Sequence, residues 1–251
     1  MNTGLLVLLA LAAGIGTAAV GPGGVLVTAD LLLLTGLTPE QVSGTAIATQ
    51  TAVGLLGASV FLRSGQLRDP DTVRVAWALA GVSLAGTPVG VVLNGLVSGR
   101  GFALGLAVLT ATAGVLVWTR ERRAPEAPGT PVPRLPATTV MTTGFLVAAA
   151  SGAFGLGGPL LAVPLLIALG MPLLPVLAAA QVQSIVIAGV GSLGYLAQGA
   201  VDPLLALLTG IPQLAGILIG WKLARMLSGR TLKYTLAAVL TALAPCLAFQ
   251  R

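Results

Sequence analysis

Histidine is absent from the 251 residues, and cysteine occurs only once, at Cys246. A chain without histidine has no histidine proton relay or metal site, and a single cysteine argues against an internal disulfide or a thiolate cluster. We therefore expect no metal and no cofactor. Charge is also scarce, since Asp, Glu, Lys and Arg make up 8% of the chain. So few charges cannot cover the surface of a soluble domain of this length.

Apolar residues dominate instead, with 56% hydrophobic residues and a mean hydropathy of +0.99. Apolar runs of about 17–25 residues recur, as membrane-spanning helices require. No long stretch alternates with period two, which argues against a β-barrel. The sequence thus predicts an all-α integral membrane protein in contact with the lipid bilayer. The net charge of +6 does not indicate a nucleic-acid partner, because the basic residues lie in short loops between the spans.

Two glycine clusters interrupt the apolar runs, and the chain repeats itself around them. The clusters are Gly21-Pro22-Gly23-Gly24 and Gly155-Leu156-Gly157-Gly158-Pro159, which are offset by 134 residues. The same offset continues downstream, where it pairs Gly36 with Gly170, Gly57 with Gly191, Phe61 with Tyr195, Gly65 with Gly199 and Gly86 with Gly220. We interpret this as an internal duplication with one glycine break near the start of each copy.

A glycine cluster between apolar segments ends one helix and lets another begin. The first N–H groups of the second helix have no intrahelical partner, and they direct partial positive charge into the break. Such a break is a ready anion site, and transporters built from repeats place broken helices at their substrate sites. The alternative is that the glycines only permit close helix packing. That alternative does not explain a cluster at the same place in both copies.

The order of segments predicts five per copy. Residues 5–35 as one helix would extend about 46 Å, well beyond a hydrocarbon core of about 30 Å. Two short helices that meet at the glycines as a hairpin fit better. The expected segments are a broken pair at 4–36, spans at 42–62, 73–93 and 102–119, a broken pair at 138–170, and spans at 175–197, 204–223 and 233–249. The expected domains are a first transmembrane repeat at 1–119, a cytoplasmic linker at 120–136 and a second transmembrane repeat at 137–251.

Loop charge favours one topology. If the Arg63–Arg74 loop is cytoplasmic and both broken pairs return to their own side, eleven of the thirteen basic residues lie inside. If each broken pair crosses the membrane once, the split is eight inside and five outside. The positive-inside rule prefers the first arrangement. Five segments per copy then make the copies inverted, as in many secondary transporters.

Ordered motifs in both copies carry a family resemblance over nearly the whole chain. Besides the two glycine clusters, they are Ser43-Gly44-Thr45-Ala46, Ser64-Gly65-Gln66-Leu67, Val163-Pro164-Leu165 and Gly199-Ala200-Val201-Asp202. With these motifs the sequence resembles the sulfite exporter (TauE/SafE-type) family. The resemblance implies a multi-pass permease of the bacterial inner membrane that exports sulfite, organosulfonates or similar small anions.

Few polar groups are available to complete an anion site. Thr45 and Thr49 share a helix face, and Gln50 follows them. The alternatives are that hydroxyls bond their own helix carbonyls and that glutamines link neighbouring helices. The candidate substrate-binding residues are Gly21, Gly23, Gly24, Val25, Thr45, Thr49, Gln50, Gly155, Gly157, Gly158, Gln183 and Ser184.

Asp30 is the one carboxylate inside an apolar segment. An ionised carboxylate is costly there unless it faces a polar cavity, finds a partner or takes up a proton. We expect it to couple anion movement to protons, and a protonated, hydrogen-bonded structural Asp is the alternative. A membrane-embedded enzyme would need more acids, histidines or a nucleophile–base pair, so we expect no enzyme. A passive anion channel and a structural membrane module remain alternatives, and the oligomeric state is open.

Overall fold

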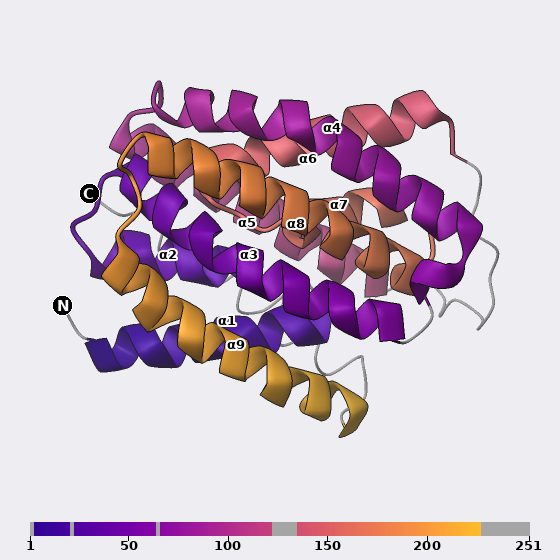
Figure 1. Ribbon diagram of the computed structural model, residues 1–251, viewed down its shortest axis with the longest axis horizontal. Coiled ribbons are helices and arrows are strands. Elements are labelled where there is room, and N and C mark those ends of the chain that lie inside the picture. The colour runs from indigo at the N-terminus through magenta and orange to yellow at the C-terminus, as the bar shows by residue number, and fades with distance from the viewer. Residues whose placement is uncertain (1–2, 21–22, 64–65, 122–134, 227–251) are drawn as a thin grey trace.

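The computed structural model describes residues 3–20, 23–63, 66–121 and 135–226, and every regular element within these ranges is a helix. Most of the helices run along the long axis of the molecule (Figure 1). The first copy contains α1 (Thr3–Val20), α2 (Gly24–Leu34), α3 (Pro39–Arg63), the short helix η1 (Gln66–Arg68), α4 (Pro70–Asn94) and α5 (Gly99–Glu121). The second contains α6 (Ala137–Phe154), α7 (Pro159–Ala168), α8 (Leu173–Ala197) and α9 (Pro203–Met226).

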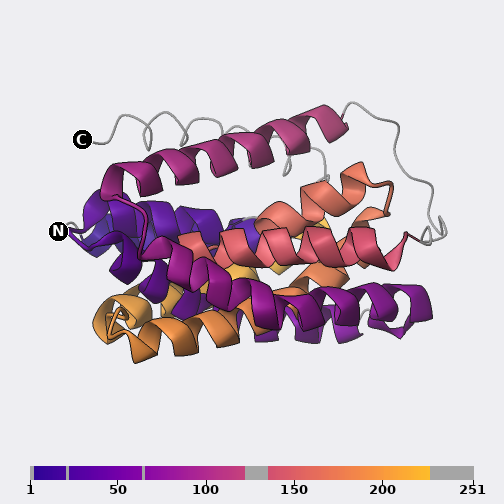
Figure 2. The ribbon, with the colours of Figure 1, turned by 90° about the horizontal axis from the view of Figure 1, so that it is seen from above.

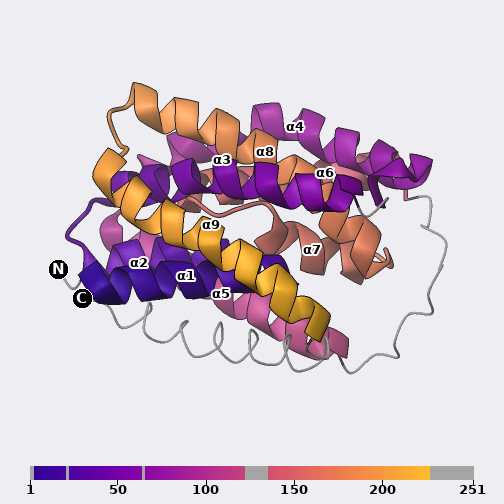
Figure 3. The same cartoon turned by 60° about the horizontal axis from the view of Figure 1, so that its bottom comes forward.

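Each glycine cluster separates a longer helix from a short one. α1 and α6 have 18 residues each, whereas α2 has 11 and α7 has 10. At about 1.5 Å per residue, α2 and α7 reach only about 15–17 Å, too short to cross a bilayer. After the first break α2 leads back towards the end of the molecule where α1 begins (Figures 1 and 3). The expected break of each segment into two helices is therefore confirmed.

Four helices in the described ranges are long and apolar enough to span a membrane. They are Pro70–Asn94, Ala137–Phe154, Pro175–Ala197 and Pro203–Gly220. The described residues thus confirm the expected all-helical architecture with apolar helices of membrane-spanning length. The expected span at 233–249 and most of the linker at 120–136 lie outside the described residues.

The bundle is built around the pair α3 and α8. α4 packs on α8 and α6, while α9 packs on α3 and α1. The views in Figures 1 and 3 agree on α1 beside α9 at one side of the pair. α5 lies along another side of the bundle, where it contacts α7 (Figure 2).

Glycines let these helices touch backbone to backbone. A Cβ at Gly90 of α4 would lie 2.0 Å from the carbonyl oxygen of Ala149 in α6. A Cβ at Gly14 of α1 would lie 2.0 Å from the carbonyl oxygen of Gln213 in α9. No side chain fits at such contacts, so small residues set the helix spacing, as is common in membrane proteins.

The packing corrects one pairing of the two copies. Gly86 of α4 meets Phe145, Ala148 and Ala149 of α6, while Gly216 of α9 meets Leu11, Gly14 and Ile15 of α1. The three α1 residues are the counterparts of the three α6 residues at an offset of 134. The packing counterpart of Gly86 is therefore Gly216, and its pairing with Gly220 is wrong by one helical turn. The shared Leu-Ala-Gly at 84–86 and 214–216 carries the corrected register.

Candidate functional site

The two glycine breaks meet at the side chain of Gln50. A Cβ at Gly24 would lie 3.0 Å from Gln50 Nε2 and 3.2 Å from the backbone nitrogen of Gly157. A Cβ at Gly157 would in turn lie 3.3 Å from Gln50 Oε1. Residues more than 130 positions apart thus lie around one carboxamide, and the absence of two side chains makes room for it.

Local chemistry fixes where the second break begins and ends. Gly155 ends α6 in the left-handed region at φ 66°, a conformation that glycine adopts without steric cost. Pro159 begins α7, where its missing N–H leaves no unmade bond. Between them Gly157 and Gly158 carry no side chain, so their backbone is open to close approach.

Gln50 is the most informative polar residue at this junction. It is 2% exposed, and its Nε2 has no hydrogen-bond partner. A buried donor without an acceptor costs free energy, so a native protein retains one where a ligand or water supplies the acceptor. Together with the free N–H groups at the start of a helix, this amide can receive an oxyanion.

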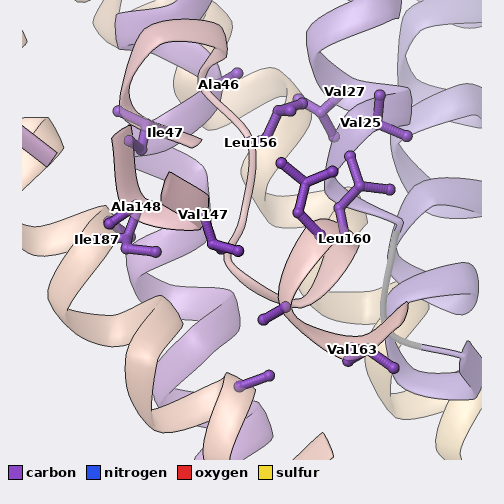
Figure 4. Close-up of a cluster of buried hydrophobic side chains, with 14 of the residues drawn as sticks. Val25, Val27, Ala46, Ile47, Val147, Ala148, Leu156, Leu160, Val163 and Ile187 are labelled. Carbon is purple, nitrogen blue, oxygen red and sulfur yellow. The ribbon is translucent and has the colours of Figure 1, made fainter. Parts of the chain in front are cut away.

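An apolar cluster surrounds the junction. Figure 4 shows Val25 and Val27 of α2 beside Leu156 of the second break and Leu160 of α7. All four side chains are buried. Polar groups in such surroundings interact more strongly than they do in water, because water does not screen them.

Of the remaining candidate glycines, one lies at the site and others lie in contacts between helices. A Cβ at Gly158 would lie 3.4 Å from the backbone of Ser184, which places that part of α8 against the start of α7. Gly23 faces α1 instead, because a Cβ there would lie 2.1 Å from the carbonyl oxygen of Ala13. Gly155 packs on the backbone of Ser43. Gly21 lies outside the described residues.

Three polar candidates have structural partners. Thr49 donates to the carbonyl oxygen of Ala46 in its own helix at 2.7 Å. Thr45 accepts from the backbone N–H of Asp202 at 3.0 Å, which ties α3 to the start of α9. Gln183 links three helices, because its Nε2 donates to Ser83 Oγ at 3.1 Å and to the carbonyl oxygen of Gly144 at 3.0 Å. These three side chains are not brought into the junction around Gln50.

Asp30 lies on α2, six residues beyond Gly24. It is 3% exposed, and its Oδ2 has no hydrogen-bond partner. Thr28, two residues earlier, donates to the carbonyl oxygen of Gly155 at 3.2 Å. The helix that carries the carboxyl group is thus bonded directly to the second break.

The sequence reasoning missed a set of donors at the end of α6. Tyr195 Oη donates to the carbonyl oxygen of Gly152 at 2.7 Å, and Ser43 Oγ donates to that of Ala153 at 3.0 Å. Asn94 Nδ2 donates to the same Ala153 oxygen and to Ser43 Oγ. The available signal was the tyrosine at position 195, where the first copy has Phe61.

A family model described as sulfite exporter TauE/SafE matches residues 6–246. The chain belongs to this family. Membership in the sulfite exporter TauE/SafE family, together with the apolar helices, makes it a multi-pass integral membrane protein of a transporter family. The resemblance drawn from the sequence motifs is confirmed. No curated protein and no solved structure matches the chain.

Proposed function

We propose that the protein is a secondary transporter that exports sulfite, an organosulfonate or a similar small anion across the bacterial inner membrane by alternating access. The observation that carries this proposal is the Gln50 carboxamide between the two glycine breaks, with an unpartnered, buried Nε2. Sulfite and sulfonates have several oxygens that can each accept a hydrogen bond, which suits a site made of N–H groups.

The anion site consists of the starts of α2 and α7 and the side chains between them. The N–H groups of Gly24 and Val25 come from α2, and those of Gly157 and Gly158 come from the second break. Gln50 adds its amide, and Ser184 lies against Gly158. Thr45, Thr49 and Gln183 support the helices around this site, because their hydrogen bonds are made elsewhere.

The architecture that suits this mechanism is a pair of inverted repeats, residues 1–119 and 137–251, each a re-entrant hairpin followed by three spans. Symmetric contacts between α3 and α8 support it. A Cβ at Gly57 would contact Gln181, and a Cβ at Gly191 would contact Ile47. Gly191 is the counterpart of Gly57, and Gln181 that of Ile47, as expected for a two-fold axis between the helices.

Asp30 is the proposed proton-coupling group. Its negative charge disfavours a nearby anion, so protonation favours binding and ionisation favours release. Asp30→Asn keeps the size of the protonated form and removes the titration. It should retain anion exchange and lose net transport driven by a pH gradient. Unchanged net transport with an unchanged pH profile would make Asp30 structural.

Flux in proteoliposomes tests the transport proposal. Sulfite and methanesulfonate are offered, with chloride as a reference, and flux is measured again after the proton gradient is collapsed. A coupled transporter should lose uphill movement and keep exchange, whereas a channel passes anions down their gradient in both conditions. No flux of any of the three anions would contradict the proposal.

Gly24→Val tests the location of the site, with Gly189→Val as its matched control. The new side chain at Gly24 enters the space of the Gln50 amide, while a Cβ at Gly189 meets nothing within 4 Å. We expect Gly24→Val to insert in the membrane and to lose sulfite binding, and Gly189→Val to bind as the unmodified protein does. Unchanged affinity in Gly24→Val would place the site elsewhere.

A further inference from the structure

The donors at the end of α6 act on a particular pair of carbonyl groups. Tyr195 of α8, Ser43 of α3 and Asn94 of α4 all donate to the carbonyl oxygens of Gly152 or Ala153, in the last turn of α6. The three side chains come from different helices, and each is at most 1% exposed. Three buried donors thus converge on one helix terminus.

The charge at this terminus is opposite to that at the start of α7. The last carbonyl groups of a helix have no intrahelical donor, and they carry partial negative charge equivalent to about half an electron. Only residues 155–158 separate this end of α6 from the N-terminus of α7. An anion in the break would therefore meet attraction from α7 and repulsion from α6.

Side-chain donors cancel that repulsion. Each hydrogen bond to a terminal carbonyl group places a positive hydrogen against the negative oxygen and satisfies an acceptor that water cannot reach. Thr28 adds a fourth donor, since it bonds the carbonyl oxygen of Gly155 at 3.2 Å. The partial positive charge at the N-terminus of α7 then dominates the electrostatic potential in the second break.

The counterparts of these donors in the other copy are apolar residues. The counterparts are Leu177 for Ser43, Phe61 for Tyr195 and, in the corrected register of α4 and α9, Ala224 for Asn94. The counterpart of Thr28 is Ala162. None of these four side chains has a hydrogen-bond donor. Among the residues that the structure describes, this donor set therefore acts on the second break.

We propose that Ser43, Asn94 and Tyr195 are positioning residues that make the second break the anion-selective half of the site, by neutralising the carbonyl end of α6 and fixing Gly157 and Gly158 in place. This inference rests on the proposed anion site. It adds that the two breaks are unequal and that the selectivity for ligand charge depends on side chains that do not touch the anion.

Binding of two ligands of different charge tests this role. Calorimetry at one alkaline pH compares methanesulfonate, a monoanion, with sulfite, which is a dianion there. The purified protein carries Asp30→Asn, so that an ionised Asp30 does not oppose either ligand. Tyr195→Phe restores the residue of the first copy and removes only the hydroxyl group. Because repulsion grows with ligand charge, Tyr195→Phe should weaken sulfite binding about tenfold and methanesulfonate binding only about threefold.

Ser192→Ala is the matched control. Ser192 lies on α8, three residues before Tyr195, and its hydroxyl pairs with that of Thr51 at 3.3 Å, away from the end of α6. It should change neither dissociation constant. Ser43→Ala is the second variant and should reproduce the unequal loss, so the test does not depend on the folding of Tyr195→Phe.

Each outcome decides between the claims. Unequal losses in Tyr195→Phe and Ser43→Ala with no change in Ser192→Ala support the donor set. Equal losses for the two ligands, unchanged binding, or an effect matched by Ser192→Ala overturn it while the anion site stands. Failure of the Asp30→Asn protein to bind either anion, with Ser43, Asn94 and Tyr195 intact, overturns the anion site and, with it, the role of these donors.

Discussion

At the scale of single residues, Gln50 and Gln183 are two buried glutamines with different roles. Gln183 Nε2 donates hydrogen bonds to Ser83 Oγ and to the carbonyl oxygen of Gly144, so its amide holds α8 to α4 and α6. Gln50 keeps a buried Nε2 without a partner, at the point where the two glycine breaks meet. The first amide is a helix-to-helix bond, and the second is an open donor. The two residues should therefore respond differently to the same substitution.

Leucine at each position separates the two roles. Gln50→Leu removes no hydrogen bond of Nε2, so its thermal stability should equal or exceed that of the unmodified protein while sulfite affinity falls at least about tenfold. Gln183→Leu should lose about 1 kcal/mol of stability, the usual size for such bonds between membrane helices, with little change in affinity. The measurements are melting temperature in detergent and the dissociation constant for sulfite. The reverse pattern would move the binding role to Gln183.

At the scale of elements, glycine decides which helices can touch. α4 has one glycine in a close helix contact and one in open space. A Cβ at Gly90 would meet the backbone of α6, whereas a Cβ at Gly81 would meet nothing within 4 Å. Helix propensity alone would favour alanine at both positions. Close packing overrides that preference at Gly90 only.

Alanine substitutions within α4 measure this difference. Gly90→Ala puts a methyl group against the Ala149 carbonyl oxygen, where backbone must move, so it should cost about 1–3 kcal/mol. Gly81→Ala adds the same group in open space and should leave stability unchanged or slightly higher. Melting temperatures of the two variants in the same detergent provide the comparison. Equal melting temperatures would show that α4 and α6 are not held at this contact.

The start of α4 gives a prediction about pH. Asp69 is the N-cap, and its Oδ2 accepts from Thr72 Oγ1 at 2.7 Å and from the Thr72 backbone N–H at 2.8 Å. These bonds, the side-chain one first, hold the pKa of the Asp69 carboxyl below its usual range. The cap therefore contributes stability above the unfolded pKa, and that contribution disappears as the pH falls through the folded pKa.

Asp69→Ala should accordingly lower the free energy of unfolding by about 0.5–1 kcal/mol at neutral pH. This difference in stability from the unmodified protein should shrink in strong acid. Asp69→Asn keeps a good capping residue that does not titrate, so it should match the unmodified protein at neutral pH. Melting curves from neutral pH to about pH 3 provide the measurement. A difference between Asp69→Ala and the unmodified protein that grows towards acid would contradict the assigned role of the carboxylate.

At the scale of the whole molecule, the charges of the loops predict which end of the bundle faces the cytoplasm. The loop between α4 and α5 lies at the end of the bundle where α1 begins, and the start of α6 lies at the other end (Figures 1 and 2). The distribution of basic residues predicts that this second end is cytoplasmic. The proposed inverted repeats require both chain termini on the outer side.

Cysteine labelling in intact cells tests this arrangement. On a Cys246→Ser background, Ser98→Cys between α4 and α5 should react with an impermeant maleimide. Ala137→Cys at the start of α6 should react only after the cells are opened. Both native side chains are exposed. Labelling of Ala137→Cys from outside, with Ser98→Cys protected, would invert the topology and leave the fold unchanged.

The sequence by itself determined which stretches of the described chain form helices and where the two breaks lie. Pro39, Pro70 and Pro159 begin helices, Gly155 ends one, and the apolar runs between such positions have the lengths of the spans. These features are local. The backbone angles open to glycine and proline, and the length and hydrophobicity of each apolar run, can be read from neighbouring residues alone. The glycine breaks, and Gln50 as a candidate beside them, were accessible from that information.

Only the tertiary structure decided which side chains meet. Gln50 and Gln183 look alike in sequence, and the partners that separate their roles, Gly157 for one and Ser83 for the other, lie about 100 residues away along the chain. The sequence paired Gly86 with Gly220 instead of Gly216, an error of one turn, because glycines four residues apart lie on one helix face. Only the packing of α4 and α9 decided between them. The donors at the end of α6 come from three helices, and no local pattern records such a convergence.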